Sequence, residues 1–483
     1  MANGLAARNG GPVGLALLVA ILLLGLGLRV GYAWDGREPV YDARAYAAIA
    51  ANLEGGEGFT VGAGATQPSS NYSPGLPLLV AGVYELTGGV DERLARVVLA
   101  LIASFAVLLT YLIGRRLGTA LALASAGPGN PPPPLGVAGD RRGRGVAAGL
   151  IGALAVAVYP AFLEYGGMLM SEPLAATLLA GSVLGLLWAR DRAELWPWLV
   201  PGLALGALAL VRPEYLAVGA LLAVVVLVSG MGDRALLPLA TQRVTKDGSA
   251  PGWRRSVAAA ALVLAGMAVV VVPWTVRNVV ALDRAVPIST GGGQVLYAGT
   301  YLPSDGDPEK VGAAVVAENP QIFVPGDAQR LRLEQILARL AAATYPGLES
   351  DKALSRMGRE QLWDDVSEEP LEYAGFVATK VGRIWSHGPR EVMRRPLWEA
   401  LHWALLGLGL LGLGVLAWKR RWEALAIATV FVSITALSAL LVASPRRVLV
   451  LLPLLAACAG YGAVWLWAQI RKVGPRLVQK RSV

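Results

Sequence analysis

Long apolar runs separated by short charged segments make up most of this sequence. A transmembrane helix needs about 20 consecutive apolar residues, and ten runs reach or approach that length. They are residues 13–33, 93–114, 146–163, 173–189, 196–211, 213–229, 256–275, 398–417, 423–442 and 446–468. The pattern predicts an all-α protein, a polytopic bundle of about ten transmembrane helices.

The composition supports this class. Of the 483 residues, 55% are hydrophobic and only 16% are charged, and the mean hydropathy of +0.53 excludes an ordinary soluble multidomain protein. The net charge of +9 comes from short Lys and Arg clusters between the apolar runs. No nucleic-acid motif accompanies them, so we expect no nucleic-acid partner. Cys458 is the single cysteine, which excludes an intramolecular disulfide and a cysteine-based metal site.

The basic clusters orient the predicted spans. Lys and Arg favour the cytoplasmic side of a membrane, and five clusters all fall on that side when both termini are cytoplasmic. These clusters are Arg115-Arg116 with residues 141–144, Arg190 with Arg192, residues 243–255, residues 419–421 and residues 471–481. The first apolar run shows no convincing cleavage site, so we expect a retained span rather than a signal peptide.

Two stretches interrupt the simple alternation of spans and loops. Residues 74–89 are apolar but short and contain Glu85, so we expect a helix along the outer surface that does not cross. The runs at 196–211 and 213–229 are also short, and Arg212-Pro213-Glu214 places a charge pair between them. This pair is either a loop at the membrane surface or a break in a span at the midplane.

The spans and loops divide the chain into four parts. These are a transmembrane module at 1–275 with a first outer loop at 34–92, an extracytoplasmic helical segment at 276–396, C-terminal transmembrane helices at 397–470 and a basic cytoplasmic tail at 471–483. Apolar periodicity predicts helices at 327–343, 350–366 and 373–385. We expect mobile cytoplasmic linkers at 118–145, where four consecutive prolines cannot continue a helix, and at 246–253.

Polar side chains gather where the predicted spans meet the outer loops. Asp42, Arg44 and Tyr46 follow the first span directly and introduce a short helical pattern at 45–53. Convergence of polar clusters from separate segments on one face is what an active site requires. The outer-face candidates for such a site are Asp42, Arg44, Tyr46, Tyr72, Glu172, Arg212 and Arg277.

The order of these features along the chain is similar to the order found in a known protein family. The ordered set is Asp42 with Tyr46, Gly58-Phe59, Ser73-Pro74-Gly75-Leu76-Pro77, Arg115-Arg116, Tyr159-Pro160, Ser171-Glu172, Arg212-Pro213, Pro273-Trp274 and Arg277-Asn278. It resembles the C-type glycosyltransferases (GT-C), in particular the branch of protein O-mannosyltransferases and bacterial aminoarabinose transferases, over most of residues 13–300. Ala43 follows Asp42 where many relatives carry a second acid, which leaves the branch, the acceptor and the use of a metal open.

The resemblance implies a membrane-embedded glycosyltransferase of the bacterial plasma membrane. It would move a sugar from a polyprenyl-phosphate donor to a glycan, lipid or protein acceptor on the extracytoplasmic face, with membrane lipids around it. Asp42 then matches the family's first acidic position, as general base, and Glu172 the second catalytic acid. Departure of a phosphate needs cations, for which Arg277, Arg212 and Arg44 are candidates, with Tyr46 and Tyr72 as further substrate-binding residues.

Other functions stay open at this point. A transporter or lipid flippase is the main alternative, although such proteins usually show inverted repeats or charges at the midplane. A non-catalytic scaffold is a third reading. His387 and His402 are too isolated for a metal site, so we expect surface or interface roles, and no cofactor is identified, while a divalent metal remains open. Gly291-Gly292-Gly293 lacks the Lys and Ser/Thr of a P-loop, and we expect a tight turn.

Overall fold

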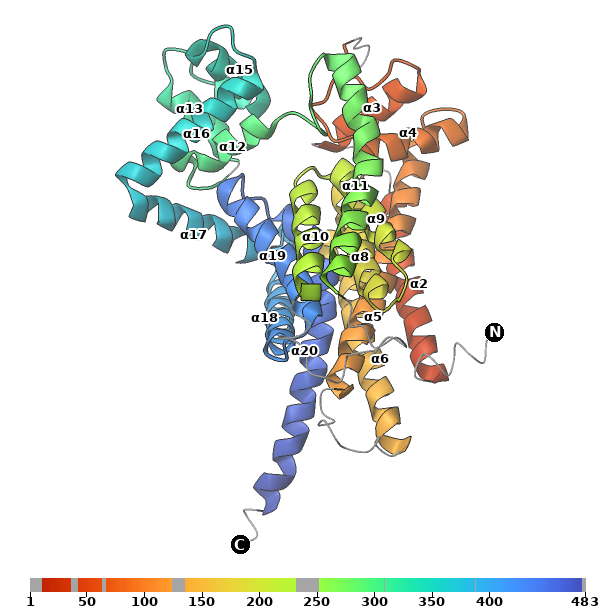
Figure 1. Ribbon diagram of the computed structural model, residues 1–483. Helices are drawn as coiled ribbons and strands as arrows, with labels where there is room; N and C mark the ends of the chain where they lie inside the picture. The colour runs from red at the N-terminus through yellow and green to blue at the C-terminus, as the bar shows by residue number, and fades with distance from the viewer. Residues whose placement is uncertain are drawn as a thin grey trace.

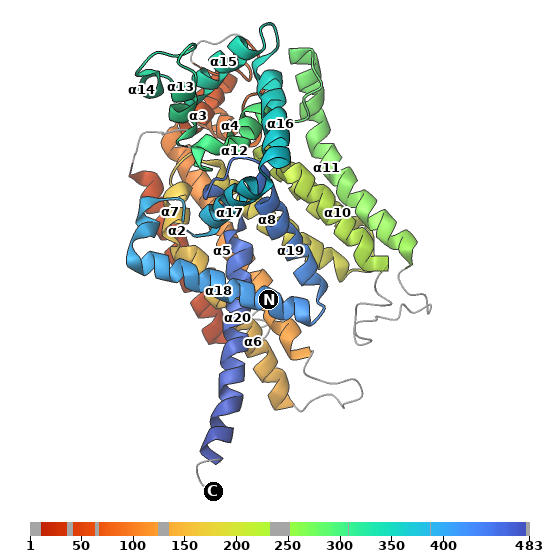
Figure 2. The same cartoon turned by 90° about the vertical axis from the view of Figure 1, so that its left-hand side faces the viewer.

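The computed structural model describes residues 11–35, 42–62, 67–123, 135–231, 252–307, 309–386 and 388–479. Within these residues the regular secondary structure is helical, which confirms the predicted all-α class. Figures 1 and 2 show a long bundle with short helices laid across one end and the C-terminus at the other. We call the end that carries α3 (Asp42–Glu54) and α4 (Gly75–Thr87) the outer end, and the opposite one the inner end.

The predicted spans are present as helices. In the described residues, seven helices are long and apolar enough to cross a membrane. They are α2 (Pro12–Trp34), α5 (Glu92–Leu123), α8 (Ser171–Arg190), α11 (Trp253–Leu282), α18 (Pro396–Trp418), α19 (Trp422–Leu440) and α20 (Arg446–Gln479). The remaining predicted runs correspond to a pair bent by 59°, α6 (Leu135–Val158) with α7 (Pro160–Gly166), and to two shorter apolar helices, α9 (Leu199–Val211) after η1 (Trp196–Trp198) and α10 (Tyr215–Met231). The chain is an integral membrane protein.

The bend between α6 and α7 has a covalent cause. Pro160 has no amide hydrogen, so the carbonyl of Val156 lacks its usual helical donor. The fully buried guanidinium of Arg29, on α2, donates to the carbonyls of Val156 at 2.8 Å and Ala157 at 3.3 Å. An unsatisfied carbonyl within hydrocarbon costs several kcal/mol. Arg29 therefore stabilises the break that turns α7 toward the outer end.

α20 is the most buried of the long helices, with 89% of its apolar window inside the protein. Glycines let its neighbours approach closely. A Cβ on Gly460 would lie 2.1 Å from the carbonyl oxygen of Ala148 in α6, and one on Gly412 of α18 would lie 2.1 Å from the carbonyl oxygen of Cys458. α6 and α18 therefore pack closely against two sides of α20. This packing fixes the position of the first residues of α20 at the outer end.

α4 corresponds to the apolar stretch at 74–89. It has 13 residues, fewer than a span requires, and it ends at Gly88 in a left-handed conformation with φ 73°. α3 and α4 pack against one another across the outer end of the bundle (Figure 1). α3 begins at Asp42, three residues before the predicted pattern, so the acidic candidate is the first residue of the helix.

A small helical cap lies beyond the outer end. We use this name for residues 292–386, which form α12 (Gly292–Thr300), η3 (Leu302–Ser304), α13 (Val311–Glu318), α14 (Asp327–Arg330), α15 (Leu333–Thr344), α16 (Ser350–Glu368) and α17 (Pro370–Ser386). The cap has its own apolar core, which includes Tyr297, Val315, Leu337 and Leu354. The chain then returns through η4 (Glu391–Arg394) to α18.

The cap confirms two predicted helices and corrects a third. α16 and α17 cover 350–366 and 373–385, but the single helix predicted at 327–343 is wrong. Arg332 is extended there, with ψ 154°, and its backbone N–H donates to the side chain of Gln335 at 2.9 Å. This capping interaction starts a new helix. The apolar periodicity continues across the break, so the sequence pattern does not reveal that the helix is interrupted.

The predicted glycine turn is only partly correct. Gly291 has a left-handed φ of 98°, but Gly292 and Gly293 are the first residues of α12. The amide of Gly293 donates to a carboxylate oxygen of Asp351 at 2.9 Å, and a Cβ there would meet the Asp351 carbonyl oxygen at 2.0 Å. The third glycine therefore permits α12 and α16 to pack together.

Helices extend into the linker predicted at 118–145 and into the predicted basic tail. α5 continues to Leu123 and α6 begins at Leu135, so the two ends of the linker predicted at 118–145 are helical, and α20 continues through the predicted tail to Gln479. A helix ends where its backbone groups find caps rather than where hydrophobicity stops. The four prolines, residues 246–251 and His387 lie outside the described residues.

Candidate active site

Four helix ends meet at the outer end of the bundle. Asp42 is the first residue of α3, Glu172 the second of α8, Arg212 follows the last residue of α9, and Arg446 is the first of α20. Helix ends leave backbone groups and side chains directed out of the bundle. The bundle therefore brings together charged residues that lie far apart in the sequence.

Arg446 connects the two acidic candidates. Its guanidinium lies 2.8 Å from a carboxylate oxygen of Asp42 and 3.8 Å from Oε1 of Glu172. The same Glu172 oxygen accepts a hydrogen bond from Arg212 at 3.3 Å. Charge-assisted contacts of this kind are stronger than neutral ones. Asp42 and Glu172 thus share one cluster, which we call the outer charge network together with Arg212 and Arg446.

The two acids differ sharply in exposure. The side chain of Asp42 is 43% exposed, whereas that of Glu172 is 2% exposed. Oε2 of Glu172 has no hydrogen-bond partner among the described residues. Burying a carboxylate is costly unless cations and donors surround it. Asp42 is therefore accessible to a reactant, and Glu172 is placed to hold the two guanidiniums.

Further charges compensate the network. Arg212 also pairs with Glu214 at 2.9 Å, and both residues lie within the break between α9 and α10. Because Arg212 reaches Glu172 at the start of α8, this break lies at the outer end and not at the membrane midplane. Arg447 points elsewhere, donating to Ser438 at 3.0 Å and to the carbonyl of Val442 at 2.6 Å.

Two tyrosines border the network. The rings of Tyr46 and Tyr72 meet edge to face with centroids 5.7 Å apart. Burial, followed by the charges of Asp42 and Glu172, raises the pKa of the Tyr46 hydroxyl well above its ordinary value. Burial and Glu334 of the cap raise the pKa of Tyr72 to about 12. Both hydroxyls are therefore protonated near neutral pH and can donate hydrogen bonds to an anionic ligand.

α7 contributes a further ion pair at the outer end. Glu164 forms an ion pair with Arg390, which lies just before η4. Tyr165, one residue further, is within the electrostatic influence of Arg446 and Glu172. The turn that Pro160 imposes is what presents these side chains at the outer end.

Arg277 contacts the first outer loop. Arg277 donates to the carbonyls of Ser69 at 2.9 Å and Phe59 at 3.3 Å, and its guanidinium lies 4.9 Å from the ring centroid of Trp274. It holds the first outer loop against α11. Arg44 is exposed on α3.

His402 is buried, so the expected surface position is wrong. One ring nitrogen lies 3.0 Å from the hydroxyl of Tyr159 and the other 2.8 Å from the carbonyl of Trp385. α18 packs into the bundle and encloses the ring, and both nitrogens are occupied. The histidine joins α18 to the segment before α7 and to the end of α17.

Sequence reasoning missed Arg446. The signal was present, because two adjacent arginines stand at the outer end of the last predicted span, opposite to the side that basic residues favour. The contact with Asp42 joins residues 404 positions apart. Only the packing of α20 brings them together.

The described residues do not fit a resident divalent metal at this site. They contain no group of three His, Cys, Asp or Glu side chains that could hold one. The two nearest carboxylates, Asp42 and Glu172, have a guanidinium between them, which supplies the positive charge there. We derive no reaction step through a metal.

The arrangement of the helices is similar to that of solved structures of an archaeal oligosaccharyltransferase, which confirms the resemblance at the level of the fold. The oligosaccharyltransferase AglB of the archaeon Archaeoglobus fulgidus, in complex with an inhibitory peptide and a dolichol-phosphate, is similar to this chain with a TM-score of 0.53 at 14% identity, over 98% of this chain and 52% of AglB. A second crystal structure from that organism, with zinc and sulfate, gives a TM-score of 0.50 at 15% identity, over 95% of this chain and 50% of the other.

The other comparisons give a lower structural similarity or no match. The structure of ArnT from Cupriavidus metallidurans bound to undecaprenyl phosphate gives a TM-score of 0.39 at 15% identity, over 97% of this chain and 80% of ArnT. Neither a family model nor a curated protein matches the sequence. This chain spans about half the length of the oligosaccharyltransferase.

Proposed function

We propose that this protein is a membrane glycosyltransferase that moves a sugar from a polyprenyl-phosphate donor to an acceptor at the outer end. The observation that carries the proposal is the arrangement of Asp42 and Glu172 around Arg446 in a GT-C fold. An exposed acid beside partly buried cations suits a reaction in which a hydroxyl or amine loses a proton while a phosphate leaves.

The transfer step assigns a role to each group. The acceptor oxygen or nitrogen attacks the anomeric carbon of the sugar, and the bond between that carbon and the phosphate oxygen breaks. The bonding electrons leave with the phosphate, which departs as polyprenyl phosphate. Asp42 takes the proton of the acceptor, and Arg446 and Arg212 stabilise the negative charge that develops on the departing phosphate.

Glu172 keeps this arrangement assembled before substrate binds. Without a carboxylate between them, the guanidiniums of Arg212 and Arg446 would repel one another in a poorly solvated site. Tyr46 and Tyr72 supply protonated hydroxyls at the edge of the same site.

The donor class follows from location and from the fold. The network lies at the end of an apolar bundle, where a lipid-linked phosphate can enter from the bilayer while its sugar stays in water. AglB, which has this fold, was solved with a dolichol-phosphate. No soluble sugar nucleotide is then needed. A glycan, lipid or protein acceptor fits the proposal equally. The basic clusters favour an orientation with both termini in the cytoplasm, and the resemblance to bacterial transferases favours a bacterial plasma membrane.

The test is a transfer assay in proteoliposomes. Purified protein is incubated with polyprenyl phosphates that carry different radiolabelled sugars, and both sugar release and polyprenyl phosphate formation are measured. Wild type is compared with Asp42→Asn, Glu172→Gln and Arg446→Gln. Loss of about 10²-fold or more in Asp42→Asn is expected for removal of a general base.

Matched controls separate chemistry from general charge effects. Glu57→Gln removes an exposed acid just beyond α3, and Arg394→Gln removes an exposed cation in η4. Both controls should retain activity. Sugar release that survives Asp42→Asn and Glu172→Gln alike would exclude the proposed mechanism.

A further inference from the structure

α17 joins the cap to the outer end of the bundle and has one exposed face without charge. The side chains on its buried side pack against the rest of the protein, and they include Tyr373, Phe376, Lys380 and Ile384. The opposite side is exposed along the length of the helix, at Leu371, Ala374, Gly375, Ala378 and Gly382. Leu371 is 87% exposed. None of these exposed residues has a role in the proposed transfer.

The charged residues of α17 all lie on one flank. They are Glu372, Lys380 and Arg383. Successive residues of a helix are rotated by about 100°, so these three positions fall within about 80° of the helix circumference. A helix surface in contact with water normally carries charges, whereas a helix that is apolar on all sides is buried in a protein core or in a membrane. The exposed face of α17 therefore has the composition of a surface that apolar material covers.

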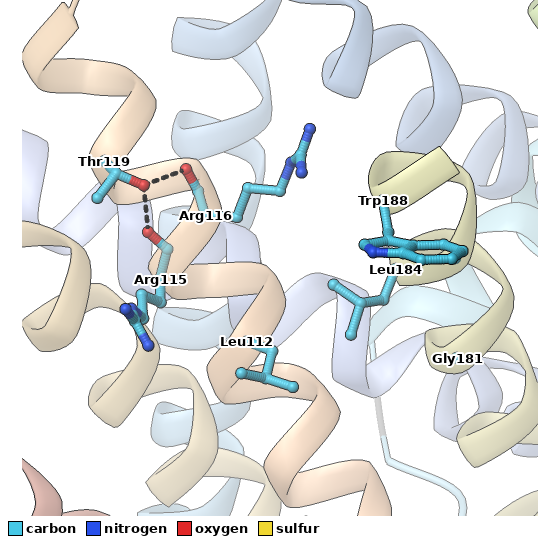
Figure 3. Close-up of a pocket in the computed structure, with 8 residues that line it drawn as sticks. Leu112, Arg115, Arg116, Thr119, Gly181, Leu184 and Trp188 are labelled. Atoms are coloured by element: carbon cyan, nitrogen blue, oxygen red, sulfur yellow. Dashed lines mark hydrogen bonds between the residues drawn. The ribbon is translucent and has the colours of Figure 1, made fainter. Parts of the chain in front are cut away.

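Aromatic and basic side chains at the inner end give a reference level for the membrane. Figure 3 shows Trp188 on α8 facing the inner part of α5 near Arg116, and the guanidinium of Arg190 lies 4.7 Å from the ring centroid of Trp422 at the start of α19. Trp and Arg are typical of the cytoplasmic boundary of a membrane. A hydrocarbon layer of about 30 Å spans about 20 helical residues, so it extends from Trp422 to the end of α19 at Leu440.

The C-terminal part of α17 contacts α19 inside this layer. The indole of Trp385 donates to the hydroxyl of Thr435 at 3.3 Å, and its ring centroid lies 6.1 Å from that of Phe431. Thr435 is five residues before Leu440, which places it about 7 Å below the outer boundary. Figure 1 shows α17 running sideways from the bundle, with its N-terminal end farthest out and no other labelled helix between that end and the level of the inner end. α17 therefore leaves the bundle at the depth of the outer leaflet.

We propose that the exposed face of α17 is inserted in the outer leaflet of the bilayer, so that this helix docks the cap on the membrane. The partner is the apolar part of the lipids, continuous with the lipid around α19, where Val432 is 66% exposed. Interfacial helices bury their apolar face about 5–10 Å into the boundary between headgroups and acyl chains. Attraction to anionic headgroups does not hold the helix, because exposed acids lie at its start, namely Glu368, Glu369 and Glu372. The proposal does not depend on transferase activity.

Spin labels on the full-length protein in lipid nanodiscs measure the depth of this face. Each label is attached to a single cysteine in the Cys458→Ser background, at Leu371→Cys or Ala378→Cys on the exposed face. Accessibility to oxygen, which concentrates in hydrocarbon, is compared with accessibility to a water-soluble nickel chelate. Val432→Cys on α19 is the lipid reference, and Ala338→Cys, exposed on α15, is the water reference. Both labels on α17 should give an oxygen-to-nickel ratio nearer to that of Val432 than to that of Ala338.

A charge introduced on the exposed face tests the cause of the docking. Ala378→Asp should shift the ratio of the label at Leu371 toward the water reference, because a charge in hydrocarbon is costly. Ala338→Asp is the matched control, since it is the same substitution at an exposed position of the cap, and it should leave that ratio unchanged. Nanodiscs of phosphatidylcholine and of phosphatidylglycerol should give the same ratios. A melting temperature for each variant excludes unfolding as the cause.

The outcomes decide between lipid and the other possible coverings of this face. Ratios at Leu371 and Ala378 equal to that of Ala338 would place the face in water and overturn the proposal. Nickel protection confined to phosphatidylglycerol would assign the contact to headgroup charge, which also overturns it. Spectral broadening that disappears on dilution with unlabelled protein would assign the face to a second copy of the chain. Lipid-like ratios in both lipids, lost in Ala378→Asp but kept in Ala338→Asp, support the proposal.

Discussion

The two ends of the bundle use arginine in opposite ways. At the outer end, Arg446 and Arg212 face Glu172, which is 2% exposed, and the acids and cations compensate one another. At the inner end, Arg116 pairs with Asp191, which is 59% exposed. The outer network is centred on a buried carboxylate, whereas the acid at the inner end is exposed.

This difference indicates different tasks. The electrostatic energy of the outer charge network changes strongly when one charge appears or disappears near the buried Glu172. Such a change occurs when a phosphate leaves and a proton moves. An ion pair whose acid is exposed, such as Arg116 with Asp191, contributes little to protein stability. Substitution of matched residues at the two ends should therefore give unequal effects.

The largest effect is expected from Arg446→Gln compared with Arg116→Gln. Removal of Arg446 takes away a cation beside both acids, and transfer should fall by about 10²–10³-fold, as for loss of a preorganised charge-stabilising donor. Arg116→Gln should leave the rate unchanged. Initial rates in proteoliposomes measure both. Similar transfer rates for the two variants would contradict the prediction that only the arginine at the outer end takes part in transfer.

Glu172→Gln should have the next largest effect, on stability. The substitution leaves two guanidiniums near one another without their shared counter-charge, and breaking a buried pair typically costs about 3–5 kcal/mol. Asp42→Asn removes a more exposed partner and should cost under about 1 kcal/mol. Denaturant unfolding in detergent gives both values. Equal losses would mean that burial does not distinguish the two acids.

Arg447→Gln tests whether the arginine next to Arg446 has a structural role and no role in transfer. Arg447 donates to Ser438 and to the carbonyl of Val442, so its loss should cost about 1–3 kcal/mol for the groups left unsatisfied. Activity per folded molecule should stay near wild type, in contrast to Arg446→Gln. Specific activity after correction for the folded fraction measures this. A transfer defect as large as that of Arg446→Gln would contradict it.

The attachment of the cap should strengthen as pH rises. Lys380 on α17 is buried and donates to the carbonyls of Gly299 at 2.5 Å and Ala439 at 2.6 Å. Burial, and then the charge of Arg447, lower the pKa of Lys380 from 10.5 to about 8. Between these two pKa values the unfolded chain binds more protons than the folded one, so the free energy of unfolding increases with pH.

Melting temperatures between pH 7 and about 10 test this coupling. Wild type should gain stability relative to Lys380→Met as the pH rises above about 8. The charge of Arg447 contributes to the shift, so the measurement also shows how far the charges of the outer end influence the cap. A constant difference between the two proteins across this range would refute the assignment.

The smallest effect is expected from Asp191→Asn at the inner end. Its ion pair with Arg116 is largely exposed, and such pairs contribute under about 1 kcal/mol. Stability should barely change. Denaturant unfolding in detergent measures it. A large loss of stability would show that the inner end is no less tightly coupled than the outer end.

The apolar runs predicted the helices well, because a span must satisfy its own backbone hydrogen bonds and bury apolar side chains in lipid. The same argument placed Asp42 and Glu172 at helix ends on one face. It failed at Arg332, where a local capping interaction breaks a helix, and at the ends of α5, α6 and α20, where helices continue past the apolar residues.

Sequence alone determined that this chain is a helical membrane protein whose acids and bases are confined to the ends of its spans, because hydrocarbon tolerates little else. Tertiary packing decided which of those charges meet. Arg446 reaches Asp42 and Glu172 because glycines let α6 and α18 close around α20. Arg29 supports the α6–α7 break from a third helix. Contacts between distant segments depend on how whole helices fit together, and no local pattern encodes them.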